Sequence, residues 1–257
     1  MKFGFVLAGS MLALSACATT SDEQTTSTVY DPLEGWNRGV YSFNEGVDKA
    51  VLEPTAKGYR AATNEPVRDG VSNFLTNLNQ PVVFANTVLQ GKPIAAVDTA
   101  ARFVLNTTAG IGGVFDLASM IDIPEHREDF GQTLGVWGVP NGPYLMLPFF
   151  GPSNLRDGAG RGVDVAFNPL TYAEFDGETA FNVTRQGVGV ISVRESLIEQ
   201  VEVLRDQPEP YIALRRNYTQ QRAAAIRDGR EQEDPFKDLP DFDDYDFGDE
   251  DEFESQE

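Results

Sequence analysis

The sequence predicts an all-α fold, and three observations support it. Apolar residues recur every three or four positions in several segments, which is the period of an amphipathic helix. Sustained alternation of apolar and polar residues, the pattern of a half-buried strand, is nearly absent. Proline and glycine gather between the periodic segments, above all in 136–152, which is predicted to be a Gly/Pro-rich loop segment.

The first half of the chain contains three predicted helices. Apolar residues between Leu33 and Val51 step by three or four, in a helix entered from Asp31-Pro32. A second pattern covers 71–78, and a third covers 82–89, with Pro81 at its first helical position. We therefore expect a helix boundary at Pro81.

Further helices are predicted in the centre and in the second half. The residues 94–105 have helical spacing behind Pro93. A long pattern covers 178–205, loosened by two internal glycines, and a basic helix covers 211–227. Because these last two helices each have a polar face, we expect them to pack antiparallel.

The charge of the chain excludes several kinds of partner and site. Its 257 residues include 20 Lys+Arg and 40 Asp+Glu, for a net charge of −20. No nucleic acid is expected as a partner, because phosphate binding needs clustered cations. A single cysteine and a single histidine, His126, exclude a disulfide framework, a Cys-based zinc site and any site with two histidines. We expect no metal and no cofactor.

The N-terminus has the pattern of an export signal. Met1-Lys2 is followed by an apolar run to Leu14, by small residues and by Cys17. This arrangement resembles a bacterial lipobox, which implies a lipoprotein signal peptide over 1–16 and acylation of Cys17. Residues 17–30 then form a lipidated flexible tether, and the absence of Asp after the cysteine favours the outer membrane. The alternative is ordinary signal cleavage beside a chance cysteine.

The segment 70–155 has few charged residues, but it is not predicted to span a membrane. The windows 70–91 and 132–155 contain no charged residue, yet prolines and asparagines interrupt them. Proline removes a backbone donor, and unpaired backbone groups are costly in hydrocarbon. Two interpretations remain: core helices of a soluble protein, or helices that lie within one membrane leaflet with their apolar sides toward lipid.

The C-terminus is predicted to be an acidic disordered tail over 230–257. From Asp228 onward the chain has fifteen acidic residues against Arg230 and Lys237. Such a block repels itself and stays solvated. A docking role for the aromatic residues of this tail is the alternative to a purely solubilising one.

No catalytic set is recognisable. The string Gly151-Pro152-Ser153-Asn154-Leu155 lacks the second glycine of a nucleophile elbow. Ser153 is better interpreted as a helix cap, and His126 as a surface residue in a charged turn. The chain is therefore predicted not to be an enzyme. A membrane-anchored lipid hydrolase and a structural, porin-associated lipoprotein stay as alternatives.

Seven strings in order resemble one known family over about 31–229. They are DPLEGWNR at 31–38, PVRDGVSNF at 66–74, QGKP at 90–93, RFVLNT at 102–107, GGVFD at 112–116, FGQTLGVWG at 130–138 and LPFFGPSNLRD at 147–157. The chain is similar to the MlaA/VacJ phospholipid-binding lipoproteins. The resemblance implies a ring-like bundle of amphipathic helices in one membrane leaflet, around a central amphipathic channel.

The same resemblance implies the role and the partners. Members of this family sit on the periplasmic side of the outer membrane, remove mislocalised phospholipids from its outer leaflet and pass them to a periplasmic lipid-carrier protein. They associate with an outer-membrane porin trimer. The candidate channel residues in this sequence are Phe43, Asn44, Asn73, Asn77, Asn106, Thr107, Gly142 and Tyr144. For the asparagines and the threonine among them, helix capping and turns are the alternative explanation.

Overall fold

The computed structural model describes residues 29–227. The predicted signal peptide, Cys17, most of the predicted tether and the whole predicted acidic tail lie outside the described residues. The part that the structure describes is mostly helical. The predicted all-α class is therefore confirmed, apart from one small β-hairpin.

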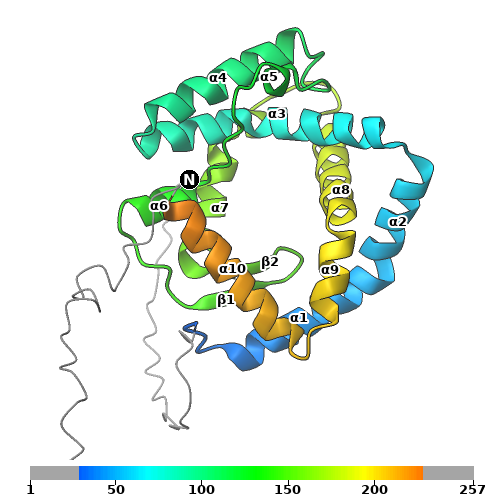
Figure 1. Cartoon of the computed structure of the whole chain (residues 1–257), viewed down its shortest axis with the longest axis vertical. Helices are drawn as coiled ribbons and strands as arrows, with labels where there is room; N and C mark the ends of the chain where they lie inside the picture. Colours follow the sequence, from blue (N-terminus) through cyan, green and yellow to red (C-terminus); the bar gives the residue numbers. More distant parts are fainter. Residues whose placement is uncertain (1–28, 228–257) are drawn as a thin grey trace, which may run out of the picture.

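The helices form a ring (Figure 1). Around it run α1, α2, α3, α7, α8, α9 and α10, while α4 and α5 lie on the side of α3 away from the enclosed space. The helical elements are α1 (Glu34–Val47), the π-helix η1 (Asp48–Leu52), α2 (Glu53–Ala62), α3 (Glu65–Leu89), α4 (Pro93–Thr108), α5 (Leu117–Met120), α6 (Phe130–Val136), α7 (Leu155–Phe167), the 3-10 helix η2 (Pro169–Thr171), α8 (Glu178–Ser196), α9 (Ile198–Arg205) and α10 (Pro210–Arg227).

The expected boundary at Pro81 is wrong, because α3 runs through it. Proline within a helix loses one backbone hydrogen bond, but a 25-residue helix packed on four neighbours compensates for that loss. The helix starts instead at Asn64, whose side chain accepts a hydrogen bond from the N–H of Val67. Contacts with helices that are distant in the sequence thus override the local signal of Pro81 for a helix boundary.

The predicted Gly/Pro-rich loop 136–152 contains a strand, and this is the main correction to the expected fold. β1 (Tyr144–Leu147) pairs antiparallel with β2 (Gly151–Asn154), so that Tyr144 lies opposite Asn154. Gly142 and Gly151 flank the strands with positive φ angles, which glycine adopts at low cost. Strands of four residues are too short to show a detectable alternation in the sequence.

The predicted helix over 178–205 is interrupted at Leu197, between α8 and α9, whereas α8 continues through both of its glycines. The predicted helix over 211–227 is confirmed as α10. The expected antiparallel pairing of these helices is wrong. α10 instead turns away after α9 and packs against α6 and β2 (Figure 1).

Within residues 29–227, no helix combines the length and the apolarity that a membrane crossing requires.

Candidate functional site

The distribution of polarity over the ring is inverted relative to an ordinary helical bundle. Among residues 29–227, eleven apolar side chains are buried, whereas thirty large apolar side chains are exposed. Eighteen polar or charged residues are buried. Large apolar patches exposed on a soluble monomer mark surfaces that contact something else. The prediction that these helices form the core of a soluble protein is therefore not supported.

The helix α4 illustrates this inversion. It buries two alanines, a threonine, an asparagine and the guanidinium of Arg102. It exposes the larger Ile94, Val97 and Val104, of which Ile94 is 78% exposed. Such a helix presents its apolar face outward, as does a helix that lies on or in a membrane surface.

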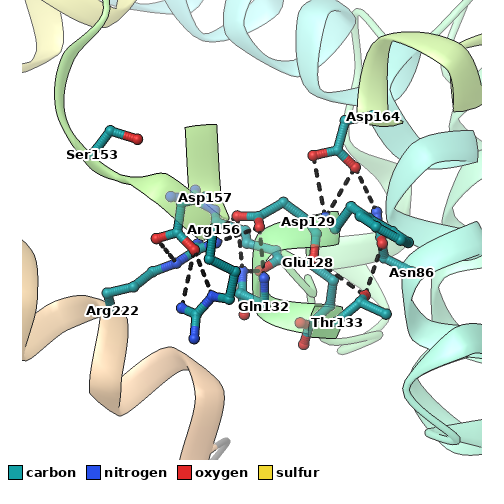
Figure 2. Close-up of polar contacts among 12 residues, drawn as sticks. Asn86, Glu128, Asp129, Gln132, Thr133, Ser153, Arg156, Asp157, Asp164 and Arg222 are labelled. Carbon is teal, nitrogen blue, oxygen red and sulfur yellow. Dashed lines mark hydrogen bonds and ion pairs between the residues drawn. The ribbon is translucent and has the colours of Figure 1, made fainter. Parts of the chain in front are cut away.

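A network of charged residues joins α6, α7 and α10 inside the molecule (Figure 2). Asp129 caps α6 by accepting a hydrogen bond from the N–H of Gln132 at 2.9 Å. Both terminal nitrogens of Arg222, on α10, donate to the two oxygens of this carboxylate at 2.5 Å. The Nε of Arg222 lies 2.7 Å from the carboxylate of Asp157 on α7, and the hydroxyl of Tyr218 also donates to Asp157.

The pKa shifts follow from burial and from these partners. Burial by itself would raise the pKa of Asp129, but the hydrogen bonds and charge of Arg222 outweigh it, and the pKa is lowered. Burial lowers the pKa of Arg222, and its two acidic partners more than reverse this, so the guanidinium stays charged. Burial raises the pKa of Asp164, which faces amides rather than a cation.

The same network continues into α3. Asn86 is fully buried, and its amide nitrogen donates to Asp164 on α7 at 2.9 Å. The amide oxygen of Asn86 accepts from the hydroxyl of Thr133, on α6, at 2.8 Å. Glu128 accepts hydrogen bonds from Gln90 and from Lys92. The polar side chains thus connect four helices where a soluble bundle would use apolar ones.

Two glycines allow this close approach of α6 and α7. A Cβ on Gly160 would lie 2.5 Å from the backbone nitrogen of Gly131. A Cβ on Gly131 would lie 2.9 Å from the Cα of Asp157. Neither distance is sterically allowed, so both positions require glycine for helix contact rather than for backbone conformation.

Two of the predicted channel residues contact the tip of the hairpin. The amide of Asn44 donates to the carbonyl of Leu147 at 3.0 Å and accepts from the N–H of Phe149 at 2.9 Å. Phe43 packs edge-to-face on Phe149, with ring centroids 5.3 Å apart. Phe149 has a φ of 65°, which is strained for a residue other than glycine.

Four other predicted channel residues hold α3 against α4 and the segment after α4. Asn77 is buried and donates to the hydroxyl of Thr107 at 2.9 Å and to the carbonyl of Gly112. Asn106 is buried too and bonds Asp116 and the N–H of Ala118. Asn73 donates to the carbonyl of Val114 at 3.4 Å. The side chains of Asn77 and Asn106 are therefore packed against neighbouring segments and do not lie on an open surface.

The two remaining candidates lie beside the hairpin. Tyr144 is only 2% exposed and packs with Val40, Met146 and Tyr211. Gly142 is exposed and has a φ of 68°. An added Cβ there would also contact Leu155 at 3.1 Å.

The residues considered for catalysis are placed in structural roles. Ser153 is fully buried, donates to the carbonyl of Asn154, and stands apart from the network in Figure 2. The prediction that Ser153 caps α7 is wrong, because Asn154 does so by accepting from the N–H of Asp157. His126 lies 3.1 Å from Asp98 and is partly buried rather than a free surface residue. In residues 29–227 no cluster of potential metal ligands occurs.

The charged network is what sequence reasoning missed. Asp129, Arg222 and Asp164 are far apart in the chain, and acidic and basic residues usually indicate solvated surface. Gly131 and Gly160, which lie close in sequence to Asp129 and Asp157, were the available signal of close helix contact.

The fold and the site define the class: a mostly helical ring protein that exposes many large apolar residues and buries charge-paired polar ones. The chain belongs to the MlaA lipoprotein family, whose model matches residues 29–225.

Curated relatives and a solved structure agree with this assignment. The chain is 35% identical over 224 residues to the intermembrane phospholipid transport system lipoprotein MlaA of Escherichia coli (strain K12), with 86% of each chain covered. An uncharacterized protein of Rickettsia felis is 36% identical over 201 residues, covering 77% of this chain and 79% of its own. A solved structure described as "Structural basis for maintenance of bacterial outer membrane lipid asymmetry" is 36% identical, with a TM-score of 0.68, and covers 76% of this chain and 98% of its own.

Proposed function

We propose that this protein is a lipoprotein of the outer membrane that removes mislocalised phospholipids from the outer leaflet and passes them to a periplasmic lipid carrier. The inverted polarity of the ring is the observation that carries the proposal. The relatives named as lipoproteins of an intermembrane phospholipid transport system, and the solved structure concerned with lipid asymmetry, support the same function.

The physical logic is a division between two surfaces. Apolar side chains such as Ile94 and Val97 on α4 gain free energy when lipid chains replace water around them. A phospholipid headgroup is costly to place in hydrocarbon, so its passage needs polar groups inside the ring. Helices that lie within one leaflet around an amphipathic channel meet both requirements.

The proposed anchor is the acylated Cys17, released from the signal peptide 1–16 and joined to the ring by the tether 17–30. Acyl chains contribute about 0.8 kcal/mol per buried CH₂, so two or more tether the protein stably. The placement is the periplasmic side of the outer membrane, beside a porin trimer. The acidic tail over 230–257 extends from the helical domain 31–229.

The proposed role is not enzymatic. A lipid hydrolase would need Ser153 to reach its substrate, and this side chain is fully buried. Passing a lipid to a carrier forms and breaks no covalent bond, so the chain needs no cofactor.

We place the control of the passage at Phe43 and Asn44, because they hold the strained hairpin tip. The backbone conformation of Gly142 fixes the direction in which the chain enters this hairpin. Asn77 and Thr107 would act through the packing of α4 on α3. Asn73 and Asn106 would act through the segment after α4, which they bond from α3 and α4, and Tyr144 through the core beneath the hairpin.

The test is the phospholipid content of the outer leaflet in a bacterial strain that lacks its own family member. The full chain should lower that content to the wild-type level, and Cys17→Ala should do so poorly. Unchanged outer-leaflet phospholipid with the full chain would overturn the proposal. Release of fatty acid by the purified protein, abolished in Ser153→Ala, would favour the hydrolase instead.

A further inference from the structure

An apolar groove of about 960 Å³ lies between the first half of α3, the segment 114–120 and the first half of α8. Of these three elements, α3 and α8 run around the ring, and α5 lies on the side of α3 away from the enclosed space (Figure 1). Apolar side chains from all three elements line it: Val67, Val71, Phe74, Met120, Phe181 and Val188. Its volume is that of a ligand site, roughly 300–1,000 Å³.

Two charged side chains at this groove have no partner. Arg185 lines it from α8, and its Nε is buried without a hydrogen bond. Within residues 29–227 no ion pair or side-chain hydrogen bond engages Arg185 or the exposed Asp69, which lines the groove from α3. The remaining acid, Asp116, is already bonded to Arg102 and Asn106.

The molecule otherwise pairs its buried guanidinium groups. Arg222, Arg194 and Arg102 each bind at least one carboxylate. A buried donor without a partner carries a desolvation cost, which an incoming anion would remove. Arginine binds phosphate oxygens well because its planar fork donates several hydrogen bonds.

We propose that this groove holds one zwitterionic phospholipid, with its acyl chains against the apolar lining, its phosphate at Arg185 and its ammonium group at Asp69. The inference rests on the proposed function and adds to it a lipid-holding site at this groove, with a preference for the headgroup. One unpaired cation and one unpaired anion above an apolar groove match the two charges and the chains of such a lipid.

Three photo-crosslinkable lipids with the same acyl chains separate these contributions. Phosphatidylethanolamine has both charges, phosphatidic acid has no ammonium group, and diacylglycerol has no phosphate. The full-length protein in mild detergent is labelled with each, and mass spectrometry locates the labelled residues. We expect labels on Phe74, Met120 and Phe181, strongest with phosphatidylethanolamine.

Arg185→Gln should lower labelling by both phosphate-bearing lipids about tenfold, the loss expected for one charge-assisted hydrogen bond, and leave diacylglycerol unchanged. Asp69→Asn should lower phosphatidylethanolamine labelling toward that of phosphatidic acid. Arg185→Lys should recover part of the loss. Arg216→Gln, which removes an exposed arginine of α10, is the matched control and should change nothing.

Equal labelling of wild type and Arg185→Gln, or labels that lie elsewhere in the chain, would overturn the inference. So would a groove that no lipid labels, as expected if a helix of another protein covers it. These outcomes leave the proposed function standing, provided that the wild-type chain clears the outer leaflet. Failure of that clearance, with the groove still labelled, would instead contradict the proposed function.

Discussion

The guanidinium group of Arg222, near the end of α10, forms a two-pronged ion pair with the carboxylate of Asp129, which caps α6. These residues are 93 positions apart, and their pairing fastens the last described helix to the middle of the chain. The ring therefore depends on a contact between charges.

Removing this arginine should destabilise the fold strongly. Arg222→Ala leaves Asp129 without its cation and leaves Asp157 with Arg156 alone, and breaking a buried pair from one side costs about 3–5 kcal/mol. For a protein of this size, that corresponds to a Tm lower by roughly 6–20 °C, measured by circular dichroism in detergent. The control Arg216→Ala, on the same helix, should stay close to wild type. An equal Tm for the two variants would show that the network does not hold α10.

Acid should weaken the same contact. The pKa of Asp129 is lowered in the folded state, so its contribution to stability is complete above the ordinary aspartate pKa of about 3.9. That contribution is lost as the pH falls through the lowered pKa. Asp129→Asn keeps the capping oxygen but removes the titration, and it should flatten the fall of Tm below about pH 4. Parallel curves for the two proteins would contradict this assignment.

The crossing of α6 and α7 should not tolerate one added methyl group. Gly160→Ala would place a Cβ against the backbone of Gly131 and should cost about 1–3 kcal/mol, as overpacking does. Gly162→Ala, two positions along the same helix, meets open space and should stabilise by about 0.5–1 kcal/mol. Chemical denaturation measures both. A destabilised Gly162→Ala, or a neutral Gly160→Ala, would contradict the packing described.

Asn44 should control the hairpin without supporting the whole fold. Asn44→Ala removes both hydrogen bonds to the tip at Leu147 and Phe149, so the Phe149 amide should exchange its hydrogen faster. Outer-leaflet phospholipid should rise while Tm falls only slightly. Ser42→Ala, whose hydroxyl bonds only its own helix, serves as the control. Unchanged exchange at Phe149 would remove the structural basis for this control.

The exposed apolar face of α4 should bind membrane by itself. With Cys17→Ala as background, part of the protein should stay with membranes after alkaline carbonate washing. Adding Ile94→Asp and Val97→Asp should release most of it, because charge on that face is costly near acyl chains. Gln220→Asp adds a similar charge to the polar α10 and should release none. Complete release of Cys17→Ala alone would mean that only the acyl anchor holds the protein.

Some elements follow from local sequence and others do not. The helical period correctly predicted α1 and α10, because each carries its pattern within one segment. The continuation of α3 through Pro81 and the turn of α10 away from α8 depend on neighbours that are distant in the chain. The hairpin was missed because each strand is only four residues long.

The candidate site shows the same division. Asn77, Asn106 and Tyr144 are unusual residues in apolar surroundings, and the sequence marks them as such. Their partners, Thr107, Asp116 and Tyr211, become neighbours only when helices pack. The sequence does not distinguish a polar helical residue that faces a passage from one that faces a neighbouring helix.

Composition and periodicity determined that this chain is helical and that its middle avoids charge, and the resemblance of its ordered motifs indicated the family. Tertiary structure decided which side of each helix faces outward. A period of 3.6 residues separates an apolar face from a polar one, but only the packing of α3, α4 and α7 determines which face is inside. In α4 the apolar face is outside, and between α7 and α10 the paired charges of Arg222 and Asp157 stand where a soluble bundle would place apolar residues.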